Sequence, residues 1–211
     1  MVDKLVVMVS STVYGVEELL ERIYTLLTAF GYEVWMSHKG TLPVFSSLSA
    51  LENCREAVRR CDLFLGLITP QYGSGVEDGD ISITHEELRL AIELNKPRWF
   101  LAHGHVVFAR TLLRNLRREK SGRPLKFGLQ VKKSDAIGDL RVIDMYEEAI
   151  SQSIPLKERK GNWVQKYYLD NEALLFATAQ FYRYQEVEAF IRENLKNSSL
   201  VAKSIANKRN G

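Results

Sequence analysis

Four short apolar stretches in the first hundred residues have the pattern of buried strands. Residues 5–9, 63–68 and 98–102 are apolar almost throughout, and residues 32–36 form a shorter run of the same kind. A strand that is buried on both faces has this continuous pattern, and such strands belong to parallel sheets covered by helices. We therefore predict four strands of one parallel sheet.

The segments between these strands have the pattern of helices. Apolar residues recur at helical spacing over residues 16–30 and 83–95, and residues 50–60 and 105–120 are predicted helices as well. Gly31 stands where a helix C-cap is expected. Because strands and helices alternate with short connections, right-handed crossovers and a single hydrophobic core are expected.

The second half of the chain is predicted to be mostly helical. Residues 140–143 are a candidate fifth strand, followed by a helix whose capping box would be Asp144 and Glu147. Residues 163–194 are predicted to form one long or broken helix with an aromatic and apolar stripe, which we interpret as core or as a dimer seam. The stripe consists of Tyr167, Leu174, Ala177, Phe181, Tyr184, Val187, Phe190 and Ile191.

Composition places the chain among ordinary globular proteins, with 45% apolar and 26% charged residues. We recognise no signal peptide and no stretch long enough to span a bilayer. We therefore expect a cytoplasmic protein that does not associate with a membrane. Cys54 and Cys61 lie too far apart along one predicted helix for a disulfide and have no further metal ligands beside them. We expect two reduced cysteines and no metal site.

The net charge of +3 is unevenly distributed, because residues 98–133 contain many Arg and Lys residues and a single acid, Glu119. A basic segment of this kind could attract nucleotide phosphates, nucleic acid or an acidic partner. Since no aromatic residues interleave with the charges as they do on base-stacking surfaces, we favour a solvated helix face over nucleic-acid binding.

Three polar segments follow predicted strands and could form a ligand site. Ligands of open parallel sheets lie beyond the carboxyl ends of the strands, at the point where the winding reverses. The first segment is Ser10, Ser11 and Thr12, whose hydroxyls could receive a phosphate or sugar or could simply cap a helix. The second contains Tyr72, Gly73 and Ser74, which suit base stacking as well as a turn. The third contains His85, Glu86 and Glu87 in the first turn of a helix.

The sequences VVMVSST, ENCREAVRRCDLFLGLITPQYGS and ISITHEELRLAIELNKP occur in that order. Together they resemble a family of domains of unknown function with an N-terminal SST motif, which is similar to Toll/interleukin-1 receptor (TIR) domains and to nucleoside 2-deoxyribosyltransferases. The resemblance covers about the first hundred residues. It implies an α/β fold, with a flavodoxin-like or TIR-like parallel sheet of four to five strands flanked by helices. The expected organisation is a core over residues 1–103, a helical C-terminal extension over residues 104–197 and a tail over residues 198–211.

The resemblance also implies a chemistry. In enzymatic TIR domains and in the transferases, a glutamate that precedes an alanine by four positions acts on the N-glycosidic bond of a nucleotide. Glu87 and Ala91 have that spacing, whereas Leu90 follows Glu86 at the same offset. Glu87 is therefore the expected catalytic carboxylate, and NAD or another nucleotide is the expected substrate or ligand, with no cofactor required.

Two function classes remain open at this point. The first is an enzyme that cleaves the N-glycosidic bond of NAD or a related nucleotide, and its expected nucleotide-binding residues are Ser10, Ser11, Thr12, Tyr72, Gly73, Ser74 and His85. The second is a signalling or defence module that senses a nucleotide without turnover and forms a homo-oligomer, or holds a partner, through its C-terminal helices.

Overall fold

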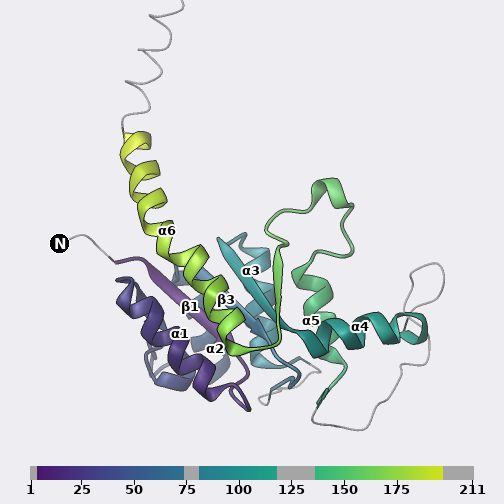
Figure 1. Ribbon diagram of the computed structural model, residues 1–211. Helices are drawn as coiled ribbons and strands as arrows, with labels where there is room; N and C mark the ends of the chain where they lie inside the picture. The colour runs from purple at the N-terminus through teal and green to yellow at the C-terminus, as the bar shows by residue number, and fades with distance from the viewer. Residues whose placement is uncertain (1–3, 74–80, 118–135, 197–211) are drawn as a thin grey trace, which may run out of the picture. The chain divides into compact units, whose positions relative to one another are not determined.

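Five parallel strands form the central sheet of the computed structural model, which describes residues 4–73, 81–117 and 136–196. Their spatial order is β2-β1-β3-β4-β5, so the winding reverses between β1 and β3 (Figure 1). The strands are β1 (Val6–Ser11), β2 (Glu33–Trp35), β3 (Leu63–Ile68), β4 (Arg98–His103) and β5 (Val164–Tyr167). The α/β class and the parallel sheet predicted from the apolar runs are confirmed.

Helices flank the sheet, as predicted. They are α1 (Glu17–Ala29), α2 (Ala50–Arg60), α3 (Ile83–Glu93), α4 (Gly104–Arg117), α5 (Arg141–Ala149) and α6 (Asp170–Lys196), with short 3-10 turns at Ser37–Lys39 and Leu156–Glu158. The chain divides into two compact units, Met1–Leu174 and Leu175–Gly211, so the whole sheet and its candidate sites lie in the first.

The core of the first unit is centred on β3, which is buried at all of its residues. One apolar cluster joins the sheet to α2, α3, α4 and α5, and includes Met8, Phe64, Phe100, Leu88 and Val106. Because β3 lies between β1 and β4, its carboxyl end is in the middle of the sheet edge. Loops that follow β3 are therefore placed beside those that follow β1.

The predicted fifth strand was wrong in position. Leu140 precedes α5 and residues 141–143 are its first turn, whereas β5 is Val164–Tyr167, within the segment predicted as the long helix. Val142, Ile143 and Met145 are buried residues of this helix, and a short apolar run does not by itself distinguish a strand from a buried helix turn. β5 is an edge strand with polar residues, so its sequence lacks the apolar run of the inner strands.

The helix predicted over residues 163–194 is shorter at its start. α6 begins at Asp170, and the Glu172 carboxylate accepts hydrogen bonds from the backbone N–H groups of Tyr168 and Leu169, at 2.6 and 3.2 Å. Its amino-terminal half is one-sided as predicted, because Ala177 and Phe181 are buried while Leu175 and Tyr182 are exposed. The stripe residues Val187, Phe190 and Ile191 have side chains outside the described part.

Both cysteines are buried, and neither forms a disulfide in the structure. Within the described ranges, no helix is both long and apolar enough to cross a bilayer. In α4, two of the basic side chains are bound within the chain, since Arg110 pairs with Glu147 and Arg117 with Asp144. Much of the basic segment, residues 118–133, lies outside the described residues.

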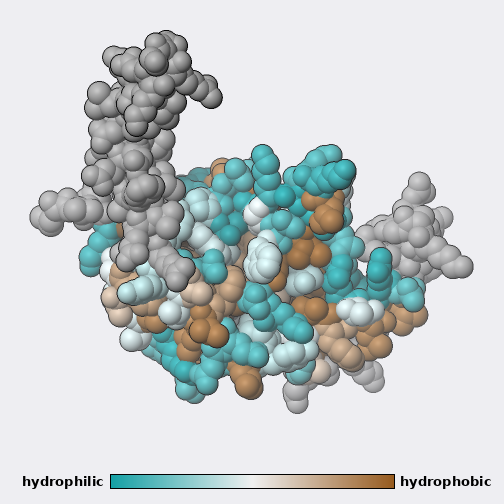
Figure 2. Space-filling view, turned by 45° about the horizontal axis from the view of Figure 1, so that its top comes forward, coloured by the Kyte–Doolittle hydropathy of each residue, from teal (hydrophilic) through white to brown (hydrophobic). Residues whose placement is uncertain are grey.

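Apolar side chains gather on the surface over α4 (Figure 2). Phe108, Leu112 and Leu116 follow one another at four-residue spacing, and each is more than half exposed. They share one face of the helix because residues four apart are neighbours on its surface.

Gly66 is required by the packing at the centre of the sheet. A Cβ atom built at this position would lie 2.8 Å from the Phe100 ring and 3.1 Å from the Phe64 ring. We predict that Gly66→Ala lowers the free energy of unfolding by about 1–3 kcal/mol, because both rings are fully buried and cannot move without strain.

Urea denaturation measures the loss of unfolding free energy. Phe100→Leu provides a background in which the clash with the ring is removed. The same Gly66→Ala change should cost less in Phe100→Leu protein, where the ring has been removed. Equal costs in the two backgrounds would show that the ring is not what excludes a side chain.

Candidate functional site

Ser10 and Glu87 meet at the carboxyl end of β1. The Ser10 hydroxyl donates a hydrogen bond to Oε2 of Glu87, with 2.5 Å between the oxygens. Ser10 is the penultimate residue of β1, and Glu87 lies in the second turn of α3. The two residues are 77 positions apart, and both are buried. The pair thus brings together two residues that the sequence singled out independently.

Glu87 is an ionisable group in a buried setting. Burial raises its pKa to about 6, although hydrogen bonds from Ser10 and from the Cys54 thiol act in the opposite direction. Cys54 comes from α2, and burial together with the nearby Glu87 charge raises the pKa of its thiol to about 12. At neutral pH this site therefore combines a neutral thiol, a hydroxyl and a mostly ionised carboxylate.

Thr12 links the loop after β1 to the loop after β3. Its hydroxyl shares a hydrogen bond with the Thr69 hydroxyl, with 2.5 Å between the oxygens, and the Gln71 carbonyl oxygen lies 3.1 and 2.9 Å from the Thr12 and Thr69 hydroxyls. Gly73 has φ +90°, and a Cβ there would lie 2.6 Å from Cγ2 of Thr12. Glycine is needed at this position both for its backbone conformation and for the close approach of Thr12.

A second buried polar chain runs from Tyr72 to α5. The Tyr72 hydroxyl lies 2.7 Å from Nδ1 of His85 and accepts a hydrogen bond from the Ser82 backbone N–H at 3.2 Å. Nε2 of His85 lies 3.1 Å from Oε2 of Glu148, and Arg89 donates two hydrogen bonds to the same carboxylate, at 2.7 and 2.6 Å. The chain joins the loop after β3, α3 and α5.

The ionisation of Glu148 assigns the protons in this chain. Burial raises the pKa of Glu148, but hydrogen bonds from Arg89 and His85 outweigh burial and hold the pKa at about 2. An ionised carboxylate can only accept, so Nε2 of His85 carries the hydrogen, and Nδ1 accepts from the Tyr72 hydroxyl when the ring is neutral. Tyr72 is thereby held in a defined position.

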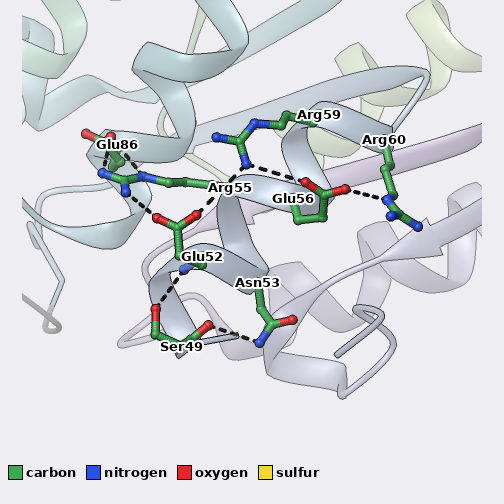
Figure 3. Close-up of polar contacts among 8 residues, drawn as sticks. All are labelled: Ser49, Glu52, Asn53, Arg55, Glu56, Arg59, Arg60 and Glu86. Atoms are coloured by element: carbon green, nitrogen blue, oxygen red, sulfur yellow. Dashed lines mark hydrogen bonds and ion pairs between the residues drawn. The ribbon is translucent and has the colours of Figure 1, made fainter. Parts of the chain in front are cut away.

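Glu86 is engaged elsewhere, although it is the neighbour of Glu87. Its carboxylate accepts from Nη2 of Arg55 at 2.9 Å (Figure 3). Arg55 also binds Glu52, whose backbone N–H is capped by the Ser49 hydroxyl at the start of α2. Adjacent helical residues point about 100° apart, so one carboxylate reaches the sheet edge while the other bridges α2 and α3.

Residues 6–155 match a family described as a domain of unknown function, DUF4062. The match spans most of the chain. The protein belongs to the DUF4062 family. No curated protein matches the chain. The matched segment includes Ser10, Cys54, Glu87 and Glu148, so the polar contacts of both buried clusters lie within the family domain.

Among the site residues predicted for this DUF4062 domain, Ser10 meets Glu87, and Thr12 meets the loop that contains Tyr72 and Gly73. His85 is bound to Tyr72. Ser11 is different, because neighbouring residues of a strand point to opposite faces and its hydroxyl donates to the Thr12 carbonyl oxygen instead. Ser74 lies outside the described residues.

Several residues of the two buried polar clusters could not be recognised from the sequence. They are Cys54, which was interpreted as a packing residue, Thr69, Arg89, Arg141 and Glu148. Glu148 and Arg89 sit on different helices 59 positions apart, and no motif marks either. The described residues contain no group of three His, Cys, Asp or Glu side chains arranged to hold a metal ion.

The raised pKa of Glu87 predicts a pH-dependent stability. Its folded-state pKa of about 6 lies above the ordinary value of 4.5, so the folded protein binds the proton more tightly than the unfolded chain. Stability is then lost as the pH rises through 4.5 to 6. We predict that Glu87→Gln gains about 2 kcal/mol over wild type between pH 4.5 and pH 7.

Urea denaturation of both proteins at the two pH values measures this gain, with Glu86→Gln as the control for loss of a neighbouring carboxylate. A stability difference between Glu87→Gln and wild type that does not change with pH would contradict the burial of an ionisable Glu87.

The lowered pKa of Glu148 predicts the opposite dependence. Its folded-state pKa of about 2 lies below 4.5, so its contribution is present above pH 4.5 and is lost as the pH falls toward 2. Because the side chain is 32% exposed, solvent reduces the effect, and we expect Glu148→Gln to lower stability at pH 7 by about 2 kcal/mol. Thermal unfolding at pH 7 and pH 3 should show the two proteins converging at the lower pH.

Proposed function

We propose that this protein binds a nucleotide at the carboxyl edge of β1 and β3 and cleaves its N-glycosidic bond, with Glu87 as the acting carboxylate. The observation that carries the proposal is the buried contact between Ser10 and Glu87 at the point where the winding of the sheet reverses. Open parallel sheets bind ligands at this point. The resemblance to TIR domains and nucleoside 2-deoxyribosyltransferases supports the same carboxylate.

The chemistry requires a negative charge beside the anomeric carbon. With a pKa of about 6, Glu87 is mostly ionised at neutral pH, and few water molecules compete for its charge because it is buried. The carbon–nitrogen bond would break with its electron pair going to the base, and Glu87 would stabilise the oxocarbenium-like state. Water then adds to the anomeric carbon and releases one proton. Nicotinamide and the ADP-ribose portion are the products if NAD is the substrate.

The hydroxyls next to Glu87 support a sugar or phosphate ligand. Ser10 already donates to the carboxylate, and a ribose hydroxyl is a donor of the same kind that could take its place. Thr12 and Thr69 add two further hydroxyls at the neighbouring loop. Backbone freedom at Gly73 allows that loop to adjust around a bound group.

Nucleotide sensing without turnover is the second candidate function, and one observation favours it. Glu87 is 5% exposed and its carboxylate is bound by Ser10 of the same chain, an arrangement that suits binding without cleavage. If the protein senses a nucleotide, α6, which exposes Leu175 and Tyr182, is the proposed contact with a second copy of the chain. For either function we propose a cytoplasmic location, in keeping with two unpaired cysteines.

The enzyme proposal predicts different outcomes for two neighbouring variants. Glu87→Gln should keep the fold and most of the nucleotide affinity but lower nicotinamide release from NAD by at least about a hundredfold, because the amide lacks the charge that stabilises the developing cation. Glu86→Gln should leave release within about threefold of wild type, since this carboxylate binds Arg55.

The assay measures nicotinamide release and nucleotide-induced thermal shift on the same preparations. Loss of activity in Glu86→Gln but not in Glu87→Gln would show that Glu87 is not the acting carboxylate. A thermal shift with NAD and no release by wild-type protein would favour the sensing function, because a ligand that binds only the folded state raises its stability.

A further inference from the structure

The ring of Tyr72 is covered by a cation of the chain itself. The guanidinium carbon of Arg141 lies 4.3 Å from the centre of the ring, which is the arrangement of a cation–π contact. Tyr72 is 4% exposed, so Arg141 contributes to a nearly complete cover. The contact joins the loop after β3 to the first residue of α5.

The Tyr72 ring is held rigidly from the other end. Its hydroxyl is fixed by His85 and by the Ser82 backbone N–H, and His85 is fixed in turn by the Glu148 carboxylate that Arg89 binds. An aromatic face held in this way loses little conformational entropy when a ligand stacks on it. The ring is therefore organised for stacking independently of Arg141.

Arg141, which covers the Tyr72 ring, is held in a different way from the ring itself. Arg141 is bound by Asp139, only two residues earlier in the chain, with 2.6 Å between Nη2 and Oδ2. The side chain of Arg141 is 37% exposed, so part of it already faces solvent. The segment also contacts the loop through a hydrogen bond from the Gly138 N–H to the Pro70 carbonyl oxygen, at 2.9 Å.

We propose that the Tyr72 ring face is a subsite for a planar cation, and that Arg141 occupies it until a ligand of that kind displaces it. Resting on the proposed function, the ligand is the positively charged pyridinium ring of an oxidised nicotinamide nucleotide. Asp139 provides the selectivity for charge. When Arg141 leaves, the Asp139 carboxylate remains beside the ring without its ion pair. A cationic ligand replaces that ion pair, whereas a neutral ligand does not.

The direct test uses 1-methylnicotinamide, a cationic ring, and nicotinamide, its neutral counterpart. Binding is measured by calorimetry on wild type and on Arg141→Ala. We expect Arg141→Ala to bind the cation about tenfold more tightly than wild type does, because the ligand no longer competes with an internal cation, and to bind nicotinamide no better. No gain, or an equal gain for both rings, would overturn the subsite.

Arg110 provides a matched control. Its guanidinium also lies over a tyrosine ring, at 5.5 Å from the centre of Tyr146, and it also pairs with a carboxylate, Glu147. Arg110→Ala removes the same charge and the same kind of contact at another place. A gain in 1-methylnicotinamide affinity as large as that of Arg141→Ala would show that loss of positive charge, and not release of Tyr72, explains the effect.

Two further variants keep the test decisive if Arg141→Ala folds poorly. Asp139→Asn loosens Arg141 but also removes the selecting charge, so it should not gain cation affinity. Arg141→Gln removes the charge while preserving most of the side chain, and should gain affinity like Arg141→Ala. Adding Tyr72→Leu to Arg141→Gln should abolish the gain, and a gain that survives would place the cation elsewhere.

Nucleotides separate this inference from the proposed function. NAD and NADH differ at the nicotinamide ring, which is cationic only in NAD, and Arg141→Ala should improve the affinity for NAD selectively. Binding or cleavage of NAD that is unaffected by Arg141→Ala would overturn the subsite and leave the proposed function standing. Binding of 1-methylnicotinamide without binding of any nucleotide would contradict the proposed function and leave the planar-cation subsite.

Discussion

The carboxylate of Glu87 connects three parts of the fold that are distant in sequence. It accepts a hydrogen bond from Ser10 at the end of β1, the Cys54 thiol of α2 lowers its pKa, and its own backbone belongs to α3. Burial of an ionisable group is costly unless donors surround it, and these two donors offset part of that cost. The contact between α3 and the sheet edge therefore includes a group whose ionisation opposes folding at neutral pH.

A buried carboxylate with a raised pKa fits the role that we propose for Glu87. A carboxylate whose pKa is raised by burial destabilises the folded protein, and a residue chosen for packing alone would not need the charge. The surface network around Arg55 and Glu86 joins α2 to α3 without burying either group completely (Figure 3).

The chain from Tyr72 through His85 to Glu148 brings α5 to the same edge of the sheet. Arg89 and Arg141 both contribute to this region, but they do so in different ways. Arg89 fixes the carboxylate that orients His85, whereas Arg141 lies over the tyrosine ring and remains partly in solvent. A rigid holder with a cover that a ligand displaces, as we propose for Arg141, is the arrangement expected where a ligand replaces part of the protein.

The sequence by itself determined the α/β class, four of the five strands and the pairing of Glu87 with the SST segment at one edge. Continuous apolar runs and one-sided helices are local patterns, and the crossover rule converts them into a parallel sheet. Tertiary structure alone decided the rest. β5 is a short edge strand that pairs with β4 through backbone hydrogen bonds, so its sequence needs no run of apolar side chains. Cys54, Glu148 and Arg141 reach the site from other helices, because long-range contacts between polar residues leave no periodicity in the sequence.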